Sequence, residues 1–180
     1  AYSTIAAERL FATPSIMHVN TFEGAFSAIE SGLCEYGILP IENSTAGSVN
    51  QVYDLMVSRN FHIVRSIRIK VDHSLLVKPG TKKEDIKEIF SHPQAISQSG
   101  EFLSSLGRDV KITECENTAI AAKMVSEAQS NTVAAISSEL CASQYNLEII
   151  KPHIQNSKNN YTRFICFSKN LEINPGADRT

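Results

Sequence analysis

Apolar residues along this chain follow two alternating patterns. Short apolar runs rich in β-branched residues predict strands, and segments in which apolar residues recur every three or four positions predict helices. The expected strands are residues 16–19, 36–41, 62–77, 89–91, 110–112, 133–136, 147–150 and 162–167. The expected helices are residues 2–11, 21–33, 49–58, a short one after Thr81, 93–106, 118–128 and 138–144. Alternating strands and helices indicate an α/β fold with mostly parallel sheets.

Residues typical of helix starts support several of these boundaries. Thr21 precedes one helical segment and Asn117 or Thr118 another, as N-cap residues do. Thr81 begins a capping-box pattern. Pro93 fits the first turn of its helix.

The chain is expected to form two lobes. The extended segment 62–77 is long enough to cross from one lobe into the other. We assign residues 1–72 and 153–169 to the first lobe and residues 73–152 to the second, because the last strand is expected to return to the first lobe. Residues 170–180 have a turn-like composition and are expected to form a tail or linker.

The composition disfavours several classes of protein. A chain of 180 residues that is 42% hydrophobic can bury a substantial core without disulfides. A net charge of −2 with scattered Lys and Arg argues against a nucleic-acid partner. No apolar stretch approaches the roughly 20 residues of a membrane helix. The first residues do not have a signal-peptide pattern, and we expect a cytoplasmic protein.

The four cysteines lie far apart in the sequence and form no metal-ligand spacing. We expect reduced, buried or nearly buried thiols rather than a zinc site or disulfides. They are Cys34, Cys115, Cys141 and Cys166.

Polar side chains gather in three segments where predicted strands end or begin. These segments are Pro40–Val49, Ser91–Gln98 and Asn160–Phe164. In open α/β sheets, ligands bind at strand exits, where helix starts supply free N–H groups, so we expect the segments to converge on one pocket. Taken singly, each segment also has a structural explanation, such as an N-cap, a turn or a surface ion pair.

Together the three segments resemble the signatures of the prephenate dehydratase family. Pro40–Ser44 with Gly47 is similar to its P-[IV]-E-N-S/T-x-x-G signature. Ser91–Gln98 is similar to S-H-P-Q-A-x-x-Q, and Asn160–Phe164 to N-x-T-R-F. Asp72–Leu76 resembles the family's segment between two lobes, so the resemblance spans the chain to about residue 169.

The resemblance implies a two-lobed α/β fold like that of type II periplasmic binding proteins, with the active site in the cleft between the lobes. It implies a lyase of phenylalanine biosynthesis that converts prephenate to phenylpyruvate with loss of CO2 and water. No metal, nucleotide or redox cofactor is expected. We expect prephenate as the small-molecule partner, no nucleic acid or membrane, and a homo-oligomer, a dimer, for the full-length protein.

Two parts of the family pattern are missing from this sequence. Members open with a strand and a Gly-rich turn, G-P-x-G-[TA]-[YF]-S, of which only Ala1–Ser3 remains. Most members also carry a C-terminal phenylalanine-sensing domain of the ACT type, and some carry an upstream chorismate mutase domain. Residues 170–180 are therefore expected to lead toward a regulatory domain.

The resemblance implies that Thr162 is the residue that acts on the leaving hydroxyl of the substrate. Because an isolated threonine is a very weak acid, either a neighbour re-supplies its proton or Thr162 mainly orients the leaving hydroxyl. Glu42 and His92 both remain open for the role of the relay. Arg163 follows Thr162 directly and points to the opposite face of a regular strand, so it is expected to brace the site.

The other expected site residues are hydrogen-bond donors for the substrate carboxylates. Gln94 and Gln98 lie four apart and share a helix face. The expected substrate-binding residues are Ser3, Asn43, Ser44, Thr45, Ser91, Gln94, Gln98 and Arg163.

Two alternatives stay open. Arogenate dehydratase, which acts on the amino analogue of prephenate, would use the same chemistry. A non-catalytic two-lobed receptor for a small anion would share the architecture, because fold alone does not decide function.

Overall fold

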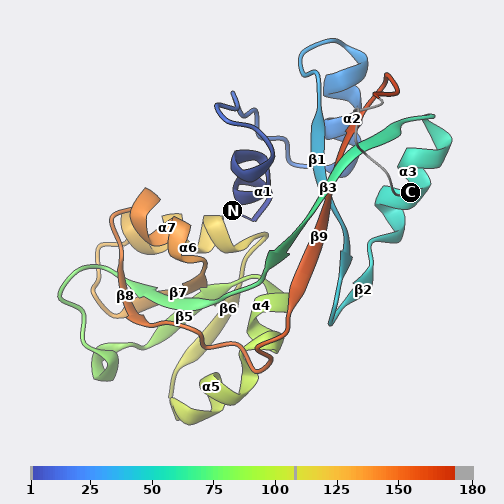
Figure 1. Ribbon diagram of the computed structural model, residues 1–180. Helices are drawn as coiled ribbons and strands as arrows, with labels where there is room; N and C mark the ends of the chain where they lie inside the picture. Colours follow the sequence, from blue (N-terminus) through green and yellow to red (C-terminus); the bar gives the residue numbers. More distant parts are fainter. Residues whose placement is uncertain (1, 108, 173–180) are drawn as a thin grey trace. The chain divides into compact units, whose positions relative to one another are not determined.

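The computed structural model describes residues 2–107 and 109–172, and the chain divides into two compact units (Figure 1). The antiparallel unit contains residues 2–70 and 160–172, and the mixed-sheet unit contains residues 71–159. Each unit has its own sheet and its own buried apolar clusters. The expected α/β class is therefore confirmed. Residues 173–180 of the expected tail lie outside the described residues.

The antiparallel unit is built on a four-stranded sheet with the strand order β2-β1-β9-β3. Its strands are β1 (Gly37–Asn43), β2 (Gly47–Ser48), β3 (His62–Lys70) and β9 (Tyr161–Ser168). Its helices are α1 (Tyr2–Leu10), α2 (Phe22–Glu30) and α3 (Asn50–Ser58). All strand pairings described in this sheet are antiparallel.

The expectation of mostly parallel sheets is wrong for this unit, because β9 lies between β1 and β3 (Figure 1). Strands β1 and β3 both run antiparallel to β9 and are therefore parallel to each other. This is the relation that a β-α-β connection through α3 requires. The sequence pattern contains that connection, but it does not show that a strand from the end of the chain separates its two strands.

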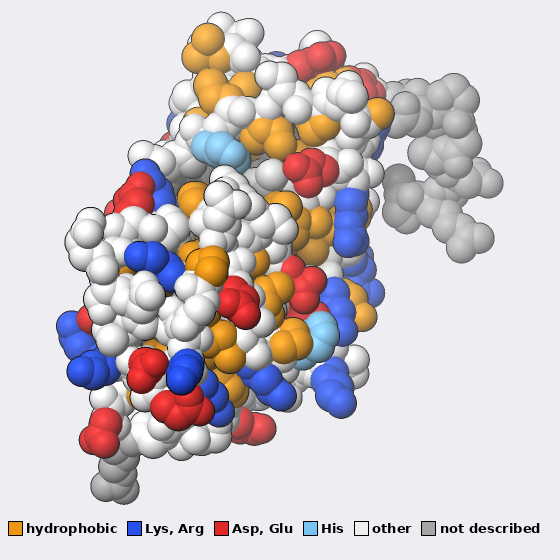
Figure 2. All heavy atoms as spheres, turned by 90° about the vertical axis from the view of Figure 1, so that its left-hand side faces the viewer, with side chains coloured by type: hydrophobic (Ala, Val, Ile, Leu, Met, Phe, Trp, Pro, Cys, Tyr) orange, Lys and Arg blue, Asp and Glu red, His pale blue; other side chains and the backbone are white. Residues whose placement is uncertain are grey.

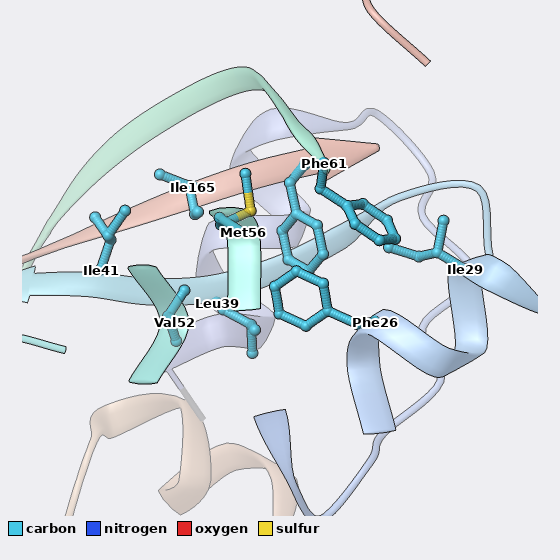
Figure 3. Packing of buried hydrophobic residues seen from close by; sticks show 9 residues of the cluster. Phe26, Ile29, Leu39, Ile41, Val52, Met56, Phe61 and Ile165 are labelled. Carbon is cyan, nitrogen blue, oxygen red and sulfur yellow. The ribbon is translucent and has the colours of Figure 1, made fainter. Parts of the chain in front are cut away.

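The two faces of this sheet are covered by different helices. Helices α2 and α3 pack on the face that carries Leu39, Ile165 and Phe167. The Phe26 ring packs edge-on against Phe61, with ring centres 5.0 Å apart, in the middle of this cluster (Figure 3). Helix α1 packs on the opposite face, whose buried strand residues include Ile69 and Phe164. The Thr162 end of β9 therefore has two distinct faces.

The expected strand at residues 16–19 does not form. These residues pair with no other strand among the described residues, and Ile16, Met17 and Val19 are each more than a third exposed. An apolar run without a partner strand cannot satisfy its backbone N–H and C=O groups in a ladder. Leu33, the last residue of the helix expected over 21–33, is also exposed, because helix α2 ends at Glu30.

The mixed-sheet unit contains a five-stranded sheet with the order β6-β5-β7-β4-β8. Its strands are β4 (Ser74–Val77), β5 (Glu88–Ser91), β6 (Lys111–Glu114), β7 (Val133–Ser137) and β8 (Glu148–Lys151). Its helices are the 3-10 turn η1 (Lys83–Asp85), α4 (Pro93–Gln98), α5 (Gly100–Ser105), α6 (Thr118–Glu127) and α7 (Glu139–Gln144). Strands β5, β6 and β7 are parallel as expected, whereas β4 runs antiparallel to both of its neighbours.

Three predicted elements have different limits in the structure. The long extended segment 62–77 is two strands, because β3 ends at Lys70 and β4 begins at Ser74. The helix expected over 93–106 breaks at Ser99 into α4 and α5. No capping box forms after Thr81, since η1 has no side-chain cap. The hydroxyl of Thr81 is buried and has no hydrogen-bond partner among the described residues.

Other helix starts agree with the sequence. Thr21 accepts a hydrogen bond from the Gly24 N–H at 3.0 Å, and Asn117 accepts one from the Ile120 N–H at 2.9 Å. Pro93 occupies the first turn of α4. These contacts satisfy N–H groups that a helix cannot satisfy internally.

Basic and acidic side chains lie interspersed on the face shown in Figure 2. Across the part of the chain that is described, none of the helices combines the length and the apolar character that crossing a membrane would need.

Gly37 leads to a prediction about the core of the antiparallel unit. It stands opposite Phe167 in the β1–β9 register, and a Cβ atom at this position would overlap the Phe167 ring. Gly37→Ala should therefore lower the free energy of unfolding by about 1–3 kcal/mol, measured by urea titration with circular dichroism. Gly100→Ala is the matched control, because the nearest atom to its added methyl lies 4.0 Å away. Equal stability of the two variants would contradict this packing.

Candidate functional site

A one-residue shift in the β1–β9 register sets the geometry at the end of β9. From Gly37 to Pro40 the paired residues follow one register, in which Pro40 faces Phe164. Between Pro40 and Glu42 the register shifts, so that Glu42 faces Arg163 and Asn43 faces Thr162. β-bulges of this kind re-aim side chains. Without the shift, Glu42 would stand opposite Thr162.

The side chain of Asn43 is fully engaged in hydrogen bonds. Its amide oxygen accepts from the Thr45 N–H at 3.0 Å, the Ala46 N–H at 2.9 Å and the Thr45 hydroxyl at 2.7 Å. Its Nδ2 group donates to Asn160 Oδ1 and to Thr162 Oγ1, both at 2.9 Å. Because the backbone N–H groups fix which end of the amide is the oxygen, the donation toward Thr162 is fixed as well.

Thr162 is half-buried and is held by this amide. Its hydroxyl oxygen accepts from Asn43, which leaves the hydroxyl proton to point elsewhere. Among the described residues, Thr162 Oγ1 has no acceptor for that proton. The arrangement presents a hydroxyl donor of fixed position on the α1 face of the sheet.

Glu42 and Arg163 lie on the other face of the sheet. They face each other across β1 and β9, one residue out of phase with Asn43 and Thr162. Since side chains alternate between faces along a strand, a direct proton relay from Glu42 to Thr162 has no path on one face. The same alternation places Arg163 away from the Thr162 hydroxyl, as expected from its position next to Thr162 in the sequence.

The segment after β1 is a hairpin turn rather than a helix start. Strand β2 separates Ser44 and Thr45 from α3, and the N-cap of α3 at Val49 makes no side-chain hydrogen bond. The N–H groups at the start of α3, which begins at Asn50, therefore follow the polar residues only after strand β2. Ser44 instead joins β9, since its N–H donates to Tyr161 O and its hydroxyl accepts from Tyr161 N–H, both at 2.9 Å.

Ser3 lies in the first turn of α1 and is exposed. Helix α1 covers the face of the sheet that carries Phe164 and Ile69. Thr162 pairs with Ile69 and shares that face. Ser3 and Thr162 thus belong to the same side of the antiparallel unit.

The second predicted segment follows the C-terminal end of β5, which lies between β6 and β7 in the mixed sheet. Ser91 ends β5, is fully buried and donates its hydroxyl proton to Ile136 O at 2.8 Å, which ties β5 to β7. His92 caps α4, with its Nδ1 accepting from the Gln94 N–H at 3.1 Å. Gln94 and Gln98 extend from α4, Gln94 exposed and Gln98 half-buried. The Ser91 hydroxyl therefore stabilises the sheet through this hydrogen bond, whereas Gln94 and Gln98 lie nearer the surface.

His73 orients Gln98. The ring Nε2 of His73 and Oε1 of Gln98 lie 2.9 Å apart, within hydrogen-bond distance, with the roles of donor and acceptor set by the histidine tautomer. Burial lowers the pKa of His73, although the Gln98 hydrogen bond and the Asp72 charge oppose the shift. His73 thus lies beside the oxygen end of Gln98, and its burial disfavours the charged form of the ring.

Two residues of these clusters belong to the segments that carry the family resemblance but were not predicted as site residues. Asn160 is 1% exposed and accepts from Asn43, and His73 is 3% exposed beside Gln98. Their place inside those segments was the only sequence signal for them. Their partners are 117 and 25 residues away in sequence, a distance that no local pattern bridges.

The cysteines are free thiols. Burial raises the pKa of the Cys166 thiol to about 11 and also raises that of Cys115. A thiol with a raised pKa is a poor nucleophile near neutral pH. Within residues 2–107 and 109–172, no cluster of three or more His, Cys, Asp and Glu side chains is placed to hold a metal ion.

Comparison with known proteins identifies the family of this chain. A family model described as "Prephenate dehydratase" matches residues 1–172. The chain is 41% identical to arogenate dehydratase/prephenate dehydratase 1, chloroplastic, of Arabidopsis thaliana, over 99% of this chain and 45% of that protein. The chain thus spans less than half the length of this curated relative.

Two solved structures are similar to the chain. A prephenate dehydratase from Arthrobacter aurescens, in complex with L-Phe, has a TM-score of 0.85 at 24% identity and covers 99% of this chain and 59% of its own. A structure described as GqqA, a novel type of quorum quenching acylase, also has a TM-score of 0.85, at 30% identity, over 97% of this chain and 63% of its own. The first of these likenesses establishes the fold alone.

The buried His73 predicts a pH dependence of stability. Its pKa is lowered in the folded protein, so the unfolded chain binds more protons between that lowered value and the ordinary pKa of about 6.5. Stability present above about pH 6.5 should therefore fall as the pH decreases below it. Urea unfolding at about pH 7.5 and about pH 5.5 should show a smaller loss for His73→Gln than for the unchanged chain. The exposed His18→Gln is the control, and an unchanged loss in His73→Gln would refute the assignment.

Proposed function

This chain belongs to the prephenate dehydratase family, and we propose that it catalyses the decarboxylating dehydration of prephenate to phenylpyruvate. The observation that carries the proposal is the Thr162 hydroxyl held by the Asn43 amide at 2.9 Å. Both residues come from segments that carry the family resemblance, and they are 119 positions apart.

The reaction consumes one proton. The electron pair of the breaking bond to the ring carboxylate moves into the ring, CO2 departs, and the ring hydroxyl leaves with its own electron pair. That hydroxyl takes up a proton and becomes water. Because the product ring is aromatic, the enzyme mainly has to hold the dianion and supply this proton in the right place.

Thr162 is proposed to donate its hydroxyl proton to the leaving oxygen. The Asn43 amide occupies a lone pair of Oγ1, so the donor direction is set before substrate binds. Asn43 acts here as a positioning residue, because both protons of its amide already have protein acceptors.

The group that re-supplies the proton is proposed to be His92 rather than Glu42. Glu42 shares a sheet face with Arg163 instead of Thr162. The Nδ1 atom of His92 is occupied by the Gln94 N–H, which leaves Nε2 as the atom that can carry a transferable proton.

Gln94 and Gln98 are proposed to bind a substrate carboxylate. Amide N–H groups donate to carboxylates without adding a positive charge that would over-stabilise the group lost as CO2. His73 presets the orientation of Gln98 by binding its oxygen. Ser3 is proposed as a further donor on the strength of the family resemblance, whereas the hydroxyl and the N–H of Thr45 already donate to the Asn43 amide oxygen.

Arogenate is a second candidate substrate, because the Arabidopsis thaliana relative carries both activities in its name. Incubating the full chain with prephenate at neutral pH and reading phenylpyruvate by its absorbance in alkali tests the main proposal. The same assay with arogenate, read as phenylalanine, ranks the two substrates. If neither prephenate nor arogenate is converted faster than in the absence of protein, the proposed function is refuted.

The compartment and the assembly of the whole protein belong to this proposal. The cytoplasm is the compartment expected from the sequence, whereas the Arabidopsis thaliana relative is named as chloroplastic. A dimer of the full-length protein, measured by light scattering, is the assembly we propose.

Thr162→Val should lower kcat by roughly 10²–10⁴-fold, because it removes the donor and keeps the β-branched shape. KM should change much less than kcat. Thr113→Val is the matched control, since it removes a strand hydroxyl that bonds Glu88. A kcat for Thr162→Val within a few-fold of that of the control would contradict the assignment.

Gln98→Ala should mainly raise KM, by about 10-fold or more if a hydrogen bond to a charged carboxylate is lost. Steady-state kinetics separate this effect from a loss of kcat. The exposed Gln144→Ala, in the same unit, should leave both constants unchanged. An unchanged KM for Gln98→Ala would remove Gln98 from the binding site.

A further inference from the structure

We propose that the antiparallel unit carries a second binding site, for a small oxyanion, on the sheet face opposite the Thr162 hydroxyl. A pocket of about 220 Å³ lies there, lined by Glu42, Ser44, Arg68, Tyr161 and Arg163. Its residues come from β1, the turn after it, β3 and β9. The site goes beyond the proposed function, since that function places no ligand on this face.

The charges of this pocket point to an anionic ligand. Arg68 and Arg163 stand directly opposite each other on β3 and β9. Like charges in that position destabilise a sheet. Glu42 of β1 faces Arg163 of β9. Among the described residues, however, neither Arg68 nor Arg163 forms an ion pair with an acidic group. An oxyanion between the two guanidinium groups would offset their repulsion and would accept hydrogen bonds from both.

The walls of the pocket are held in place by neighbouring contacts. The Arg68 guanidinium lies over the Tyr161 ring, 5.2 Å from its centre. Tyr161 is in turn joined to Ser44 by two hydrogen bonds of 2.9 Å. Such contacts restrict the Arg68 side chain before a ligand arrives, which lowers the entropic cost of binding.

The size and net charge of the pocket define the class of ligand. Two guanidinium groups and one carboxylate give the lining a net positive charge. The volume is smaller than the roughly 300–1,000 Å³ of typical drug-sized ligand sites, which favours a ligand of few atoms. The chemistry fits a carboxylate or a phosphate group, and Arg163 serves this site instead of the Thr162 hydroxyl.

Titration of the 15N-labelled chain tests the proposal, with inorganic phosphate in one arm and succinate in the other, at constant ionic strength. At least one probe should cause saturable shifts of the arginine Nε–H signals and of the backbone signals of residues 161–163. Arg68→Gln should weaken that binding by about 10-fold or more, because a charge-assisted hydrogen bond is lost. Glu42→Gln should strengthen it, because a like charge is removed.

Two control variants distinguish binding in this pocket from diffuse attraction of anions to surface arginines and from binding at the Thr162 face. Arg9→Gln removes an exposed arginine from the last turn of α1 and should leave the binding unchanged. Thr162→Val should also retain it, because Thr162 lies on the opposite face. Absence of saturable shifts with both probes would overturn the proposal, as would an equal loss of binding in Arg9→Gln or Thr162→Val.

Discussion

The register shift between β1 and β9 is the constraint on which the candidate site depends. It places Asn43 beside Thr162 and moves Glu42 to the other face, opposite Arg163. Residues adjacent in sequence thereby serve two chemically different faces of one sheet. One face carries a neutral, hydrogen-bonded hydroxyl and the other carries paired arginines. The proposed catalytic step follows from this single irregularity, and the position of Glu42 in the proposed anion site follows from it as well.

Much of the fold could be predicted from local patterns, because they depend on short-range physics. N-caps at Thr21 and Asn117, and the helices after them, follow from side chains that satisfy nearby N–H groups. The direction of the sheet in the antiparallel unit could not be predicted, since β9 inserts from the far end of the chain. The prediction of a strand at residues 16–19 was wrong for a related reason, because apolar character alone supplies no partner strand.

The candidate site was predictable in its residue types but not in its arrangement. The sequence signatures singled out Asn43, Gln98 and Thr162, and all three take part in polar contacts in the structure. Their contact with substrate is a proposal. No sequence pattern indicates that Asn43 has no amide proton to spare, because that depends on Asn160 and Thr162 lying 2.9 Å away. The role of the buried His73 was equally hidden.

We infer that the Asn43 amide sets the direction of the Thr162 hydroxyl, so that the two act as one unit. A double-mutant cycle on kcat for prephenate, with Asn43→Ala, Thr162→Val and the combined variant, tests this directly once circular dichroism shows that each variant is folded. The combined variant should be no slower than Thr162→Val alone, because Asn43 then has nothing left to position. Losses that multiply in the combined variant would show that the two residues act independently and would refute the inference.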